Sequence, residues 1–500
     1  MQEIARLKPP KKARIGLYSA GLKAYWDQFE GLKERMEGYN KFIADRLQEH
    51  CEVFNFGLVD DEIKGRAAGE WLNSQNVDLV FCHAVTYFPS AMALPIHQIC
   101  KAPVVILNLQ PAAKMNYAKT PTGEWLAHCG ACPLPEICNA LERAGIDYTT
   151  VNGLLGLSET PKISLADEVT ISRPEAIKAW KEIVEWTKAA QVKRTLMHSR
   201  FGFLGNSYSG MLDMYTDLAL MQADFGLHVE ILEMCDLDRS FQNVTDSEIE
   251  KKLKEIDDFF RIEGDSPSDP RVKRPSNEQL KWSARVAVAQ EKMVREYDLD
   301  SISYYYHSSL GNAYEDLQSG FIVGHSLLTA SGIPCAGEGD FKTAIAMKIC
   351  DILDTGGSFC EIVACDFDVG SIIMGHDGPF HIKIADEKPV LRGMGVYHGK
   401  RGSGISVEAN VKVGPVTNLG LTQIRSGKSK LIISEGQAVK GQLLTIGNTA
   451  THVKFDEKPA AYMDKWFAHA PTHHFALSVG HNAGMFAKAA KLLGIEYVTI

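Results

Sequence analysis

The stretch Ala13-Arg14-Ile15-Gly16-Leu17-Tyr18 begins the pattern that decides the fold of this chain. Its aliphatic and β-branched residues predict a strand, and the segment from Lys23 to about His50 is typical of a helix. Further strands are expected at Cys51 to Val59, Val77 to Val85 and Ala102 to Leu109, with amphipathic helical stretches between them. Strands that alternate with helices at this spacing indicate a parallel sheet with helices on both faces.

Ligands bind to such a sheet at the carboxyl ends of its strands. In this chain, those ends place Ser19 to Tyr25, His83 to Phe88 and Gln110 beside any pocket that the domain helps to form. We therefore take these segments as candidate ligand contacts.

A second α/β unit is expected after a helix at Pro174 to Ala190. Arg200 to Gly205 predicts a strand, and the turn Asn206-Ser207-Tyr208-Ser209-Gly210 follows it. This turn matches neither GxGxxG nor GxxxxGK(S/T), so a tight turn is favoured over a phosphate or dinucleotide loop. The elements expected beyond it are a helix to about residue 225, strands at 228–234 and 302–307, and helices at 246–262, 277–297, 321–330 and 341–353.

The last third of the chain changes character, because short alternating strands broken by glycine replace the strand–helix pattern. The expected strands are at residues 358–366, 371–374, 381–385, 405–413, 420–425, 430–434 and 442–446, with helices near 461–469 and 482–493. Closely spaced short strands indicate an antiparallel barrel or sandwich. We predict an α/β protein with two doubly wound parallel-sheet domains at 1–172 and 173–350, followed by an antiparallel β-barrel domain with helices at 351–500.

The bulk composition limits the classes of function. The chain has 500 residues, too many for one hydrophobic core, and its net charge of −9 gives no electrostatic reason to bind nucleic acid or an acidic membrane surface. No apolar run reaches about 18 residues and the N-terminus has no apolar segment, so we expect neither a membrane span nor a secretory signal. Eleven cysteines, an odd number in a long chain, indicate reduced thiols and a cytoplasmic location.

Three of the cysteines are close together in the sequence. Cys129 and Cys132 form a CxxC pair, Cys138 follows, and His128 is adjacent. A zinc site needs four ligands, and no second CxxC follows at a suitable spacing. Ordinary, partly buried thiols are therefore favoured over a metal or redox site.

Four places combine metal-ligand residue types with nearby turns or strands. Glu338 lies between two glycines, Glu361 lies in Ser-Phe-Cys-Glu, His376 lies in Gly-His-Asp-Gly, and His474 is the second member of a His-His pair. Each is weak alone, because a carboxylate in a loop is often solvated and one histidine of such a pair is often only structural.

Glu361 is the most informative of the four, because apolar residues surround it on both sides in its predicted strand. A buried carboxylate without a partner is expensive, and a divalent cation is a natural partner. Two carboxylates with one or two imidazoles suit Mn²⁺, and also Co²⁺ or Mg²⁺, better than a thiolate zinc site would.

These motifs together resemble the L-arabinose isomerase and L-fucose isomerase superfamily. The resemblance rests on Gly337-Glu338-Gly339-Asp340-Phe341-Lys342-Thr343, on Gly357-Ser358-Phe359 followed by Glu361, on His376 and on the final His473-His474, all in the order of that family. It implies a Mn²⁺ site built from Glu338, Glu361, His376 and His474. It also implies a cytoplasmic aldose–ketose isomerase with the same order of α/β, α/β and β-barrel domains.

The chain departs from the arabinose isomerase pattern in three places. Phe341 stands where that pattern has tryptophan, His376 stands in Gly-His-Asp-Gly rather than Gly-Ser-His, and the turn from Ala20 to Trp26 lacks the usual Gly-Ser-Gln-His. The sugar therefore stays open: L-arabinose, L-fucose, D-arabinose and hexoses modified at C6 are all candidates. Fucose-type members use three ligands, so His376 is either a ligand or a substrate contact.

Isomerisation moves a hydrogen between C1 and C2 of the sugar, and the resemblance implies an enediol route. A divalent metal stabilises the charge that develops on the sugar oxygens, while acid–base groups move the protons. We assign Glu338 and Glu361 to both roles, as ligands and as the acid–base pair. Asp340, Lys342 and His473 are expected to support the ligands, although a surface lysine at the start of a helix explains Lys342 equally well.

The N-terminal domain supplies candidate sugar contacts. The rings of Tyr25 and Trp26 can stack on a sugar, and His83 and Gln110 can bond its hydroxyls, although core packing explains the aromatic residues more simply. His473 is a fifth candidate. The resemblance further implies a homotrimer or homohexamer in which the N-terminal domain of a neighbouring subunit completes the active site.

Two other functions compete with the isomerase. A nucleotide-dependent oxidoreductase or kinase would use the α/β domains, but no phosphate-loop signature is present. A non-catalytic sugar-binding protein on the same scaffold would be expected to have lost a metal ligand, and all four are present.

Overall fold

The computed structural model describes residues 4–309, 311–395 and 403–500, and it separates into two compact units. One unit comprises residues 11–194, and the other comprises residues 1–10 together with residues 195–500. None of the described helices is both long and apolar enough to cross a bilayer. The division into domains at 1–172, 173–350 and 351–500 stays a prediction, because the larger unit holds both a parallel sheet and a barrel around shared core residues.

The unit at residues 11–194 is built on a five-stranded parallel sheet with the order β2-β1-β3-β4-β5. The strands are β1 (Arg14–Ala20), β2 (Glu52–Val59), β3 (Leu79–Ala84), β4 (Val104–Gln110) and β5 (Tyr148–Leu154). The first four lie where the sequence predicts them, and β5 was not predicted. All residues of β3 are buried, as expected for a strand covered on both faces.

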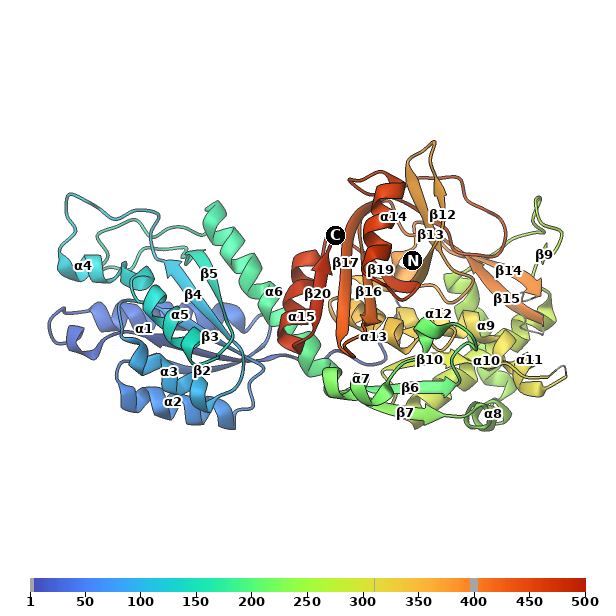
Figure 1. Ribbon diagram of the computed structural model, residues 1–500, viewed down its shortest axis with the longest axis horizontal. Coiled ribbons are helices and arrows are strands. Elements are labelled where there is room, and N and C mark those ends of the chain that lie inside the picture. The colour runs from blue at the N-terminus through green and yellow to red at the C-terminus, as the bar shows by residue number, and fades with distance from the viewer. Residues whose placement is uncertain (1–3, 310, 396–402) are drawn as a thin grey trace. The chain divides into compact units, whose positions relative to one another are not determined.

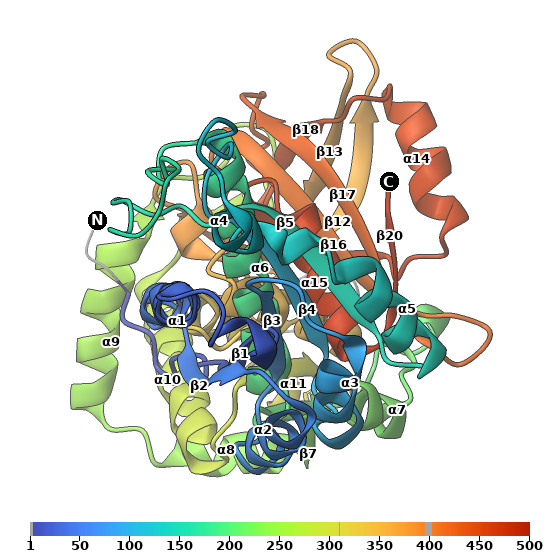
Figure 2. The ribbon, with the colours of Figure 1, turned by 90° about the vertical axis from the view of Figure 1, so that its left-hand side faces the viewer.

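Helices cover the two faces of this sheet. Residues of α2 (Glu62–Ser74), α3 (Ser90–Ile99) and α5 (Leu134–Arg143) share one hydrophobic cluster with β1, β3 and β4. Figure 2 shows α2 and α3 side by side, and the helix α1 (Leu32–Leu47) contacts β1 and β2. The expected helix from Lys23 is wrong at its start, because residues 23–25 form a short 3-10 helix and α1 begins only at Leu32.

The second parallel sheet has the order β11-β10-β6-β7. Its strands are β6 (Arg200–Gly205), β7 (His228–Leu232), β10 (Ser301–Tyr305) and β11 (Cys335–Ala336). The helices around it are α7 (Leu218–Phe225), α8 (Met234–Gln242), α9 (Asp246–Phe259), α10 (Asn277–Glu296), α11 (Ala313–Ser319) and α12 (Phe321–Ala330). The long helix α6 (Pro174–Leu196) precedes β6.

The C-terminal strands close into a barrel, because the strand order β16-β19-β12-β13-β18-β17 is completed by a pairing of β16 with β17. The barrel strands are β12 (Gly356–Asp366), β13 (Ser371–Gly375), β16 (Gly414–Gln423), β17 (Ser429–Val439), β18 (Thr451–Lys454) and β19 (His474–Val479). Their pairings are antiparallel, and β20 (Glu496–Thr499) joins β17 in parallel outside the closed circuit. The predicted fold class, two doubly wound parallel sheets followed by an antiparallel barrel, is confirmed.

Two expected strands of the last third are wrong. Residues 382–384 form a 3-10 helix, whose alternation is satisfied because Ile382 and Ile384 are buried in the core while Lys383 is exposed. Residues 442–446 have no ladder partner, and the carbonyl of Thr445 accepts its hydrogen bond from the side chain of Ser266 instead. At 382–384 the apolar side chains are therefore buried without a neighbouring strand, whereas Leu443 and Leu444 are about half exposed.

The helix α13 (Phe341–Ile352) ties the parallel sheet to the barrel. All of its residues are buried, and it contacts β10 and β11 on one side and β12, β16 and β19 on the other. A helix in such a position is expected to be largely apolar, and any charged residues on it need partners. Its buried Lys348 donates to the carbonyl of Gly332 at 2.8 Å and pairs with Asp351 at 3.0 Å, so its charge is compensated. The residues that precede α13 consequently lie where the sheet and the barrel meet.

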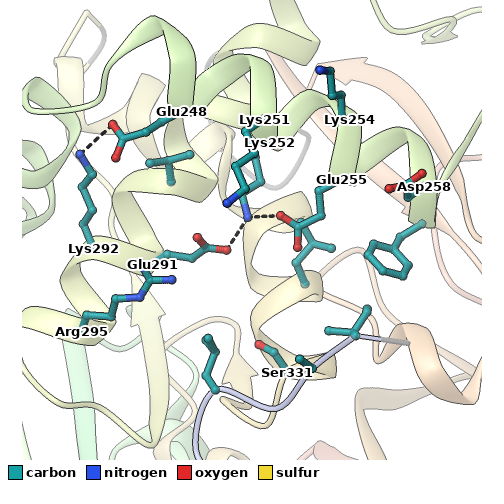
Figure 3. Close-up of a pocket in the computed structure, with 16 residues that line it drawn as sticks. Glu248, Lys251, Lys252, Lys254, Glu255, Asp258, Glu291, Lys292, Arg295 and Ser331 are labelled. Atoms are coloured by element: carbon teal, nitrogen blue, oxygen red, sulfur yellow. Dashed lines mark hydrogen bonds and ion pairs between the residues drawn. The ribbon is translucent and has the colours of Figure 1, made fainter. Parts of the chain in front are cut away.

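A separate pocket of about 600 Å³ lies among α9, α10, α12 and the N-terminal segment (Figure 3). Lys252, which is 5% exposed, pairs there with Glu255 and Glu291, and Lys292 pairs with Glu248 at 2.9 Å. These pairs compensate the buried charge of the pocket. None of the candidate site residues lines it.

Candidate metal centre

Three of the predicted ligands lie on neighbouring strands of the barrel. Glu361 in β12 pairs in register with His474, the first residue of β19, and with Gly375, the last residue of β13. His376 follows Gly375 directly and is held by its backbone, which donates to Thr449 Oγ1 at 2.8 Å and accepts from Thr449 N at 3.0 Å. Antiparallel pairing thus brings together residues that are far apart in the sequence.

Glu338 reaches the same place from the parallel sheet. It lies in the turn between β11 and α13, where ligands bind in α/β sheets. Its φ of +60° is unusual for a residue with a side chain and costs on the order of 1 kcal/mol. The next residue, Gly339, has φ +76°, and a Cβ atom there would lie 2.4 Å from the carbonyl oxygen of Asn206. The turn is tightly packed, and this packing holds the backbone of Glu338 in its unusual conformation.

The donor atoms of these residues converge. The Nε2 atoms of His376 and His474 are 3.1 Å apart, and each is 3.8 Å from an oxygen of Glu338. Donor atoms that each lie about 2.1 Å from one cation are about 3–4 Å from one another, so these separations suit a shared ion. Three overlapping groups have ligand atoms within 4.8 Å of one another: Glu338, His473 and His474; Glu361, His376 and His474; and Glu338, His376 and Asp377.

A carboxylate lies beside the Nδ1 atom of each imidazole, on the side of the ring away from the site. Asp340 Oδ2 lies 3.1 Å from Nδ1 of His474, and both side chains are fully buried. Asp340 also caps α13 by accepting from the backbone N and the hydroxyl of Thr343. Asp377 Oδ1 lies 3.2 Å from Nδ1 of His376. A carboxylate that accepts a hydrogen bond from Nδ1–H leaves Nε2 as the atom that faces the ligand, which is the usual arrangement behind a metal-binding histidine.

The surroundings of the site are apolar on one side. The ring of Phe359 packs against the rings of His376 and His474, with centroid distances of 4.6 and 4.3 Å. Glu361 is half-buried, and burial raises its pKa above the ordinary value while the imidazoles of His474 and His473 oppose that shift. Burial also raises the pKa of Asp340, but the hydrogen bond with His474 and the charge of Lys342 outweigh it and lower the pKa overall. The site therefore concentrates negative charge in an apolar shell, as a cation site requires.

His473 faces the same carboxylate from a less buried position. Its Nε2 lies 3.8 Å from Glu338 Oε2, and its ring centroid lies 3.9 Å from that of His474. Burial lowers the pKa of His473, but the carboxylates of Asp213 and Glu338 raise it by more, to about 10. Sequence reasoning missed Asp213 and Asp377. The position of Asp377 directly after His376 was the available signal for the second, whereas Asp213 lies 260 residues from His473 and gave none.

Lys342 lies beside this group and is buried, with 2% exposure. Its Nζ donates to the carbonyl of Asp213 at 2.7 Å and to Thr216 Oγ1 at 2.8 Å. The interpretation as a surface lysine is wrong, because the first turn of α13 faces inward.

The N-terminal candidates share one edge of their sheet, as predicted. His83 lies near the carboxyl end of β3, is 1% exposed, and its Nδ1 is hydrogen-bonded to Ser19 Oγ at 3.1 Å. Burial lowers the pKa of His83 to about 3. Gln110 ends β4 and donates to Asn108, Trp26 donates to Asp60 at 2.9 Å, and Tyr25 packs edge-on against Phe29. Each thus has a partner within its own unit, and a sugar contact by any of them stays a prediction.

The cysteine cluster shows no metal-binding geometry. The eleven cysteines are all free thiols, and no group of ligand-type atoms among the described residues includes Cys129, Cys132 or Cys138. Burial raises the pKa of Cys129 to about 11, so its thiol stays protonated at neutral pH.

Comparison with known proteins gives one consistent relationship. Residues 216–356, which run from the turn after β6 to the start of β12, match the family described as the L-arabinose isomerase central domain. Sequence relatives agree over a longer stretch. L-arabinose isomerase 2 of Bacillus licheniformis is 23% identical over 362 residues, covering 68% of this chain and 71% of the relative.

The chain is similar to L-arabinose isomerases over about two thirds of its length. The L-arabinose isomerase of Geobacillus thermodenitrificans is 21% identical, covering 68% of each chain, and that of Bacillus subtilis is 22% identical, covering 71% of this chain and 69% of the relative. Among solved structures, an open, ligand-free substrate-binding protein of Clostridium difficile aligns with 9% identity and a TM-score of 0.16, covering 66% of this chain and 90% of that one, which is too low to support any conclusion.

Proposed function

We propose that this chain is a metal-dependent aldose–ketose isomerase that acts on a pentose or on a deoxy or otherwise modified hexose. The observation that carries the proposal is the convergence of two glutamates and two histidines at the junction of the parallel sheet and the barrel. The similarity to L-arabinose isomerases supports it. A dinucleotide-dependent oxidoreductase and a non-catalytic sugar-binding protein are less favoured, because neither explains a complete set of ligand-type residues oriented by carboxylates.

Glu338, Glu361, His376 and His474 are the proposed ligands of Mn²⁺, with Co²⁺ and Mg²⁺ as alternatives. Their two carboxylates and two imidazoles form a donor set of the kind these ions accept. When bound, the ion would act as a Lewis acid that stabilises negative charge on the sugar oxygens. Asp340 and Asp377 hold the imidazoles so that their Nε2 atoms face the site.

The protons of the reaction are moved by the residues of the chain. Glu338 and Glu361 are the proposed acid–base pair: one carboxylate removes the proton from C2 of the aldose and returns a proton to C1, while the other helps to move the hydroxyl proton from O2 to O1, which gives the ketose. The strained turn of Glu338 and the paired strand of Glu361 fix both carboxylates before the sugar binds. His473 is a proposed sugar contact, because its Nε2 faces the same carboxylate.

The proposal extends to the setting of the enzyme. His83, Gln110, Tyr25 and Trp26 are proposed to contact the sugar from the N-terminal domain of a neighbouring subunit in a homotrimer or homohexamer. Cytoplasmic location and the absence of nucleic-acid and membrane partners belong to the same proposal.

Removal of the metal tests the proposed function. The chain, treated with EDTA and dialysed, is incubated with a panel of aldoses that includes L-arabinose, L-fucose and D-arabinose, and ketose formation is measured. We expect less than about 1% of the activity to remain and Mn²⁺ to restore it, because stabilisation of the developing charge depends on the ion. Ketose formation that is unchanged by the chelator would disprove the metal-dependent mechanism, and no ketose from any aldose with Mn²⁺ present would disprove the isomerase.

A further inference from the structure

His473 has an orientation that its position in the chain does not explain. It directly precedes β19, and successive side chains of an extended strand point to opposite sides. His474 points into the buried site, so His473 would be expected to point away from it. Its ring nevertheless lies beside that of His474, with a centroid distance of 3.9 Å, and its Nε2 faces Glu338.

The carboxylate of Asp213 accounts for this orientation. Asp213 Oδ2 accepts from the backbone N of His473 at 2.9 Å and lies 2.7 Å from its Nδ1. The main chain and the ring are thus bonded to the same oxygen, which closes a small cycle and fixes the side-chain rotamer. Because the carboxylate accepts at Nδ1, that nitrogen carries a proton and Nε2 is the atom presented to the site.

Asp213 is in turn held from the first turn of α13. It lies in a short 3-10 helix (Leu212–Met214), and its carbonyl accepts from Nζ of Lys342 at 2.7 Å. The same ammonium donates to Thr216 Oγ1 at 2.8 Å, and that hydroxyl donates to the carbonyl of Met214 at 2.9 Å. Lys342 therefore holds the backbone from Asp213 to Thr216, although the Asp213 side chain itself is 37% exposed.

We propose that Asp213, fixed by Lys342, is a positioning residue that holds His473 with Nε2 directed at the Glu338 carboxylate, where a sugar would bind. The arrangement parallels the one in which Asp340 holds His474, but it serves the sugar and not the metal. The inference rests on the proposed function, because the role of His473 is defined by the isomerase reaction. A surface ion pair that served only stability would need neither the backbone bond nor the buried lysine.

The test compares Asp213→Leu, which cannot accept a hydrogen bond, with Asp213→Asn, which keeps an acceptor oxygen. The matched control is Asp224→Leu on α7, which removes a carboxylate outside this network. For each variant, kcat and KM are measured on the aldose that the wild-type chain converts best. Mn²⁺ affinity is measured separately by the electron paramagnetic resonance signal of the free ion.

We expect Asp213→Leu to lower kcat/KM by roughly 10–100-fold, the usual effect of removing a group that orients a site residue, while Mn²⁺ affinity stays within about twofold. Asp213→Asn should retain several-fold more activity than Asp213→Leu, and the Asp224 variant should match the wild type. In a double-mutant cycle, Asp213→Leu should add little to His473→Ala, because the first residue acts through the second.

Three outcomes would overturn this inference while leaving the isomerase intact. The first is wild-type kinetics in Asp213→Leu. The second is a loss of Mn²⁺ affinity in that variant as large as its loss of kcat/KM. The third is additive effects of Asp213→Leu and His473→Ala in the double-mutant cycle. If the wild-type chain converts no aldose, the proposed function itself fails, and the role of Asp213 fails with it.

Discussion

Glu361→Gln and Glu338→Gln are each expected to lower kcat for ketose formation by roughly 10³-fold, within the range lost when a general acid–base group is removed. Glutamine keeps the shape of the side chain and one oxygen, but it neither takes a proton nor offers a charged ligand. Both effects should be large because both carboxylates converge on the same two imidazoles. The rates are measured with Mn²⁺ at saturation, so that weaker metal binding does not account for the loss.

Glu496→Gln provides the control, because Glu496 lies in β20 and is exposed, with an ion pair only to Lys428 at 3.2 Å. Its kinetics should equal those of the wild type. A variant at position 338 or 361 that keeps most of its activity would remove that glutamate from the reaction.

His474→Ala should abolish measurable Mn²⁺ binding at micromolar concentrations, and Asp340→Asn should weaken it by roughly 10–100-fold, the usual effect of changing the group behind a ligand. His474 is fully buried and its Nε2 lies close to both His376 and Glu338, so its loss removes a donor atom from the centre of the site. Asparagine caps helices about as well as aspartate, so α13 should keep its start in the Asp340 variant.

Calorimetric titration with Mn²⁺ measures both effects, and thermal unfolding of the metal-free variants shows whether the fold is retained. His228→Ala, which removes an exposed histidine of β7, should bind Mn²⁺ as the wild type does. Unchanged affinity in His474→Ala would exclude this histidine as a ligand, and unchanged affinity in Asp340→Asn would show that the buried carboxylate does not support the site.

The parts of the fold that were predictable from sequence are those where local pattern and tertiary position agree. The strands β1, β3 and β4 are short apolar runs between helices, so their burial on both faces follows from their composition, whereas the edge strand β2 is only partly buried. The strand β19 was not predicted. It begins with His474, a polar residue that is buried because it meets Glu361 on the neighbouring strand β12, and a local sequence pattern does not show that contact. Residues 382–384 were wrongly predicted as part of a strand, because Ile382 and Ile384 alternate with Lys383 and are buried in the core, although the segment is a 3-10 helix with no strand partner.

The candidate site divides in the same way. Glu338 and Glu361 were found from motif and local apolarity, and the register of β12 with β19 explains why Glu361 and His474 meet. Asp213 was not found, because its partners Lys342 and His473 are brought to it only by the packing of α13 and the barrel. Long-range hydrogen bonds of this kind leave no periodic trace in a sequence.

The most direct measurement of the proposed chemistry is mass spectrometry of the ketose formed by the Mn²⁺-loaded chain in deuterated water. An enediol route exchanges the migrating proton with solvent through a carboxylate, so we expect the ketose to gain deuterium at C1, and we expect Glu361→Gln and the EDTA-treated chain to form none. Absence of any ketose, or a ketose formed equally fast with the metal removed, would contradict the metal-dependent isomerase. A ketose formed only with the metal but without deuterium would contradict the enediol route.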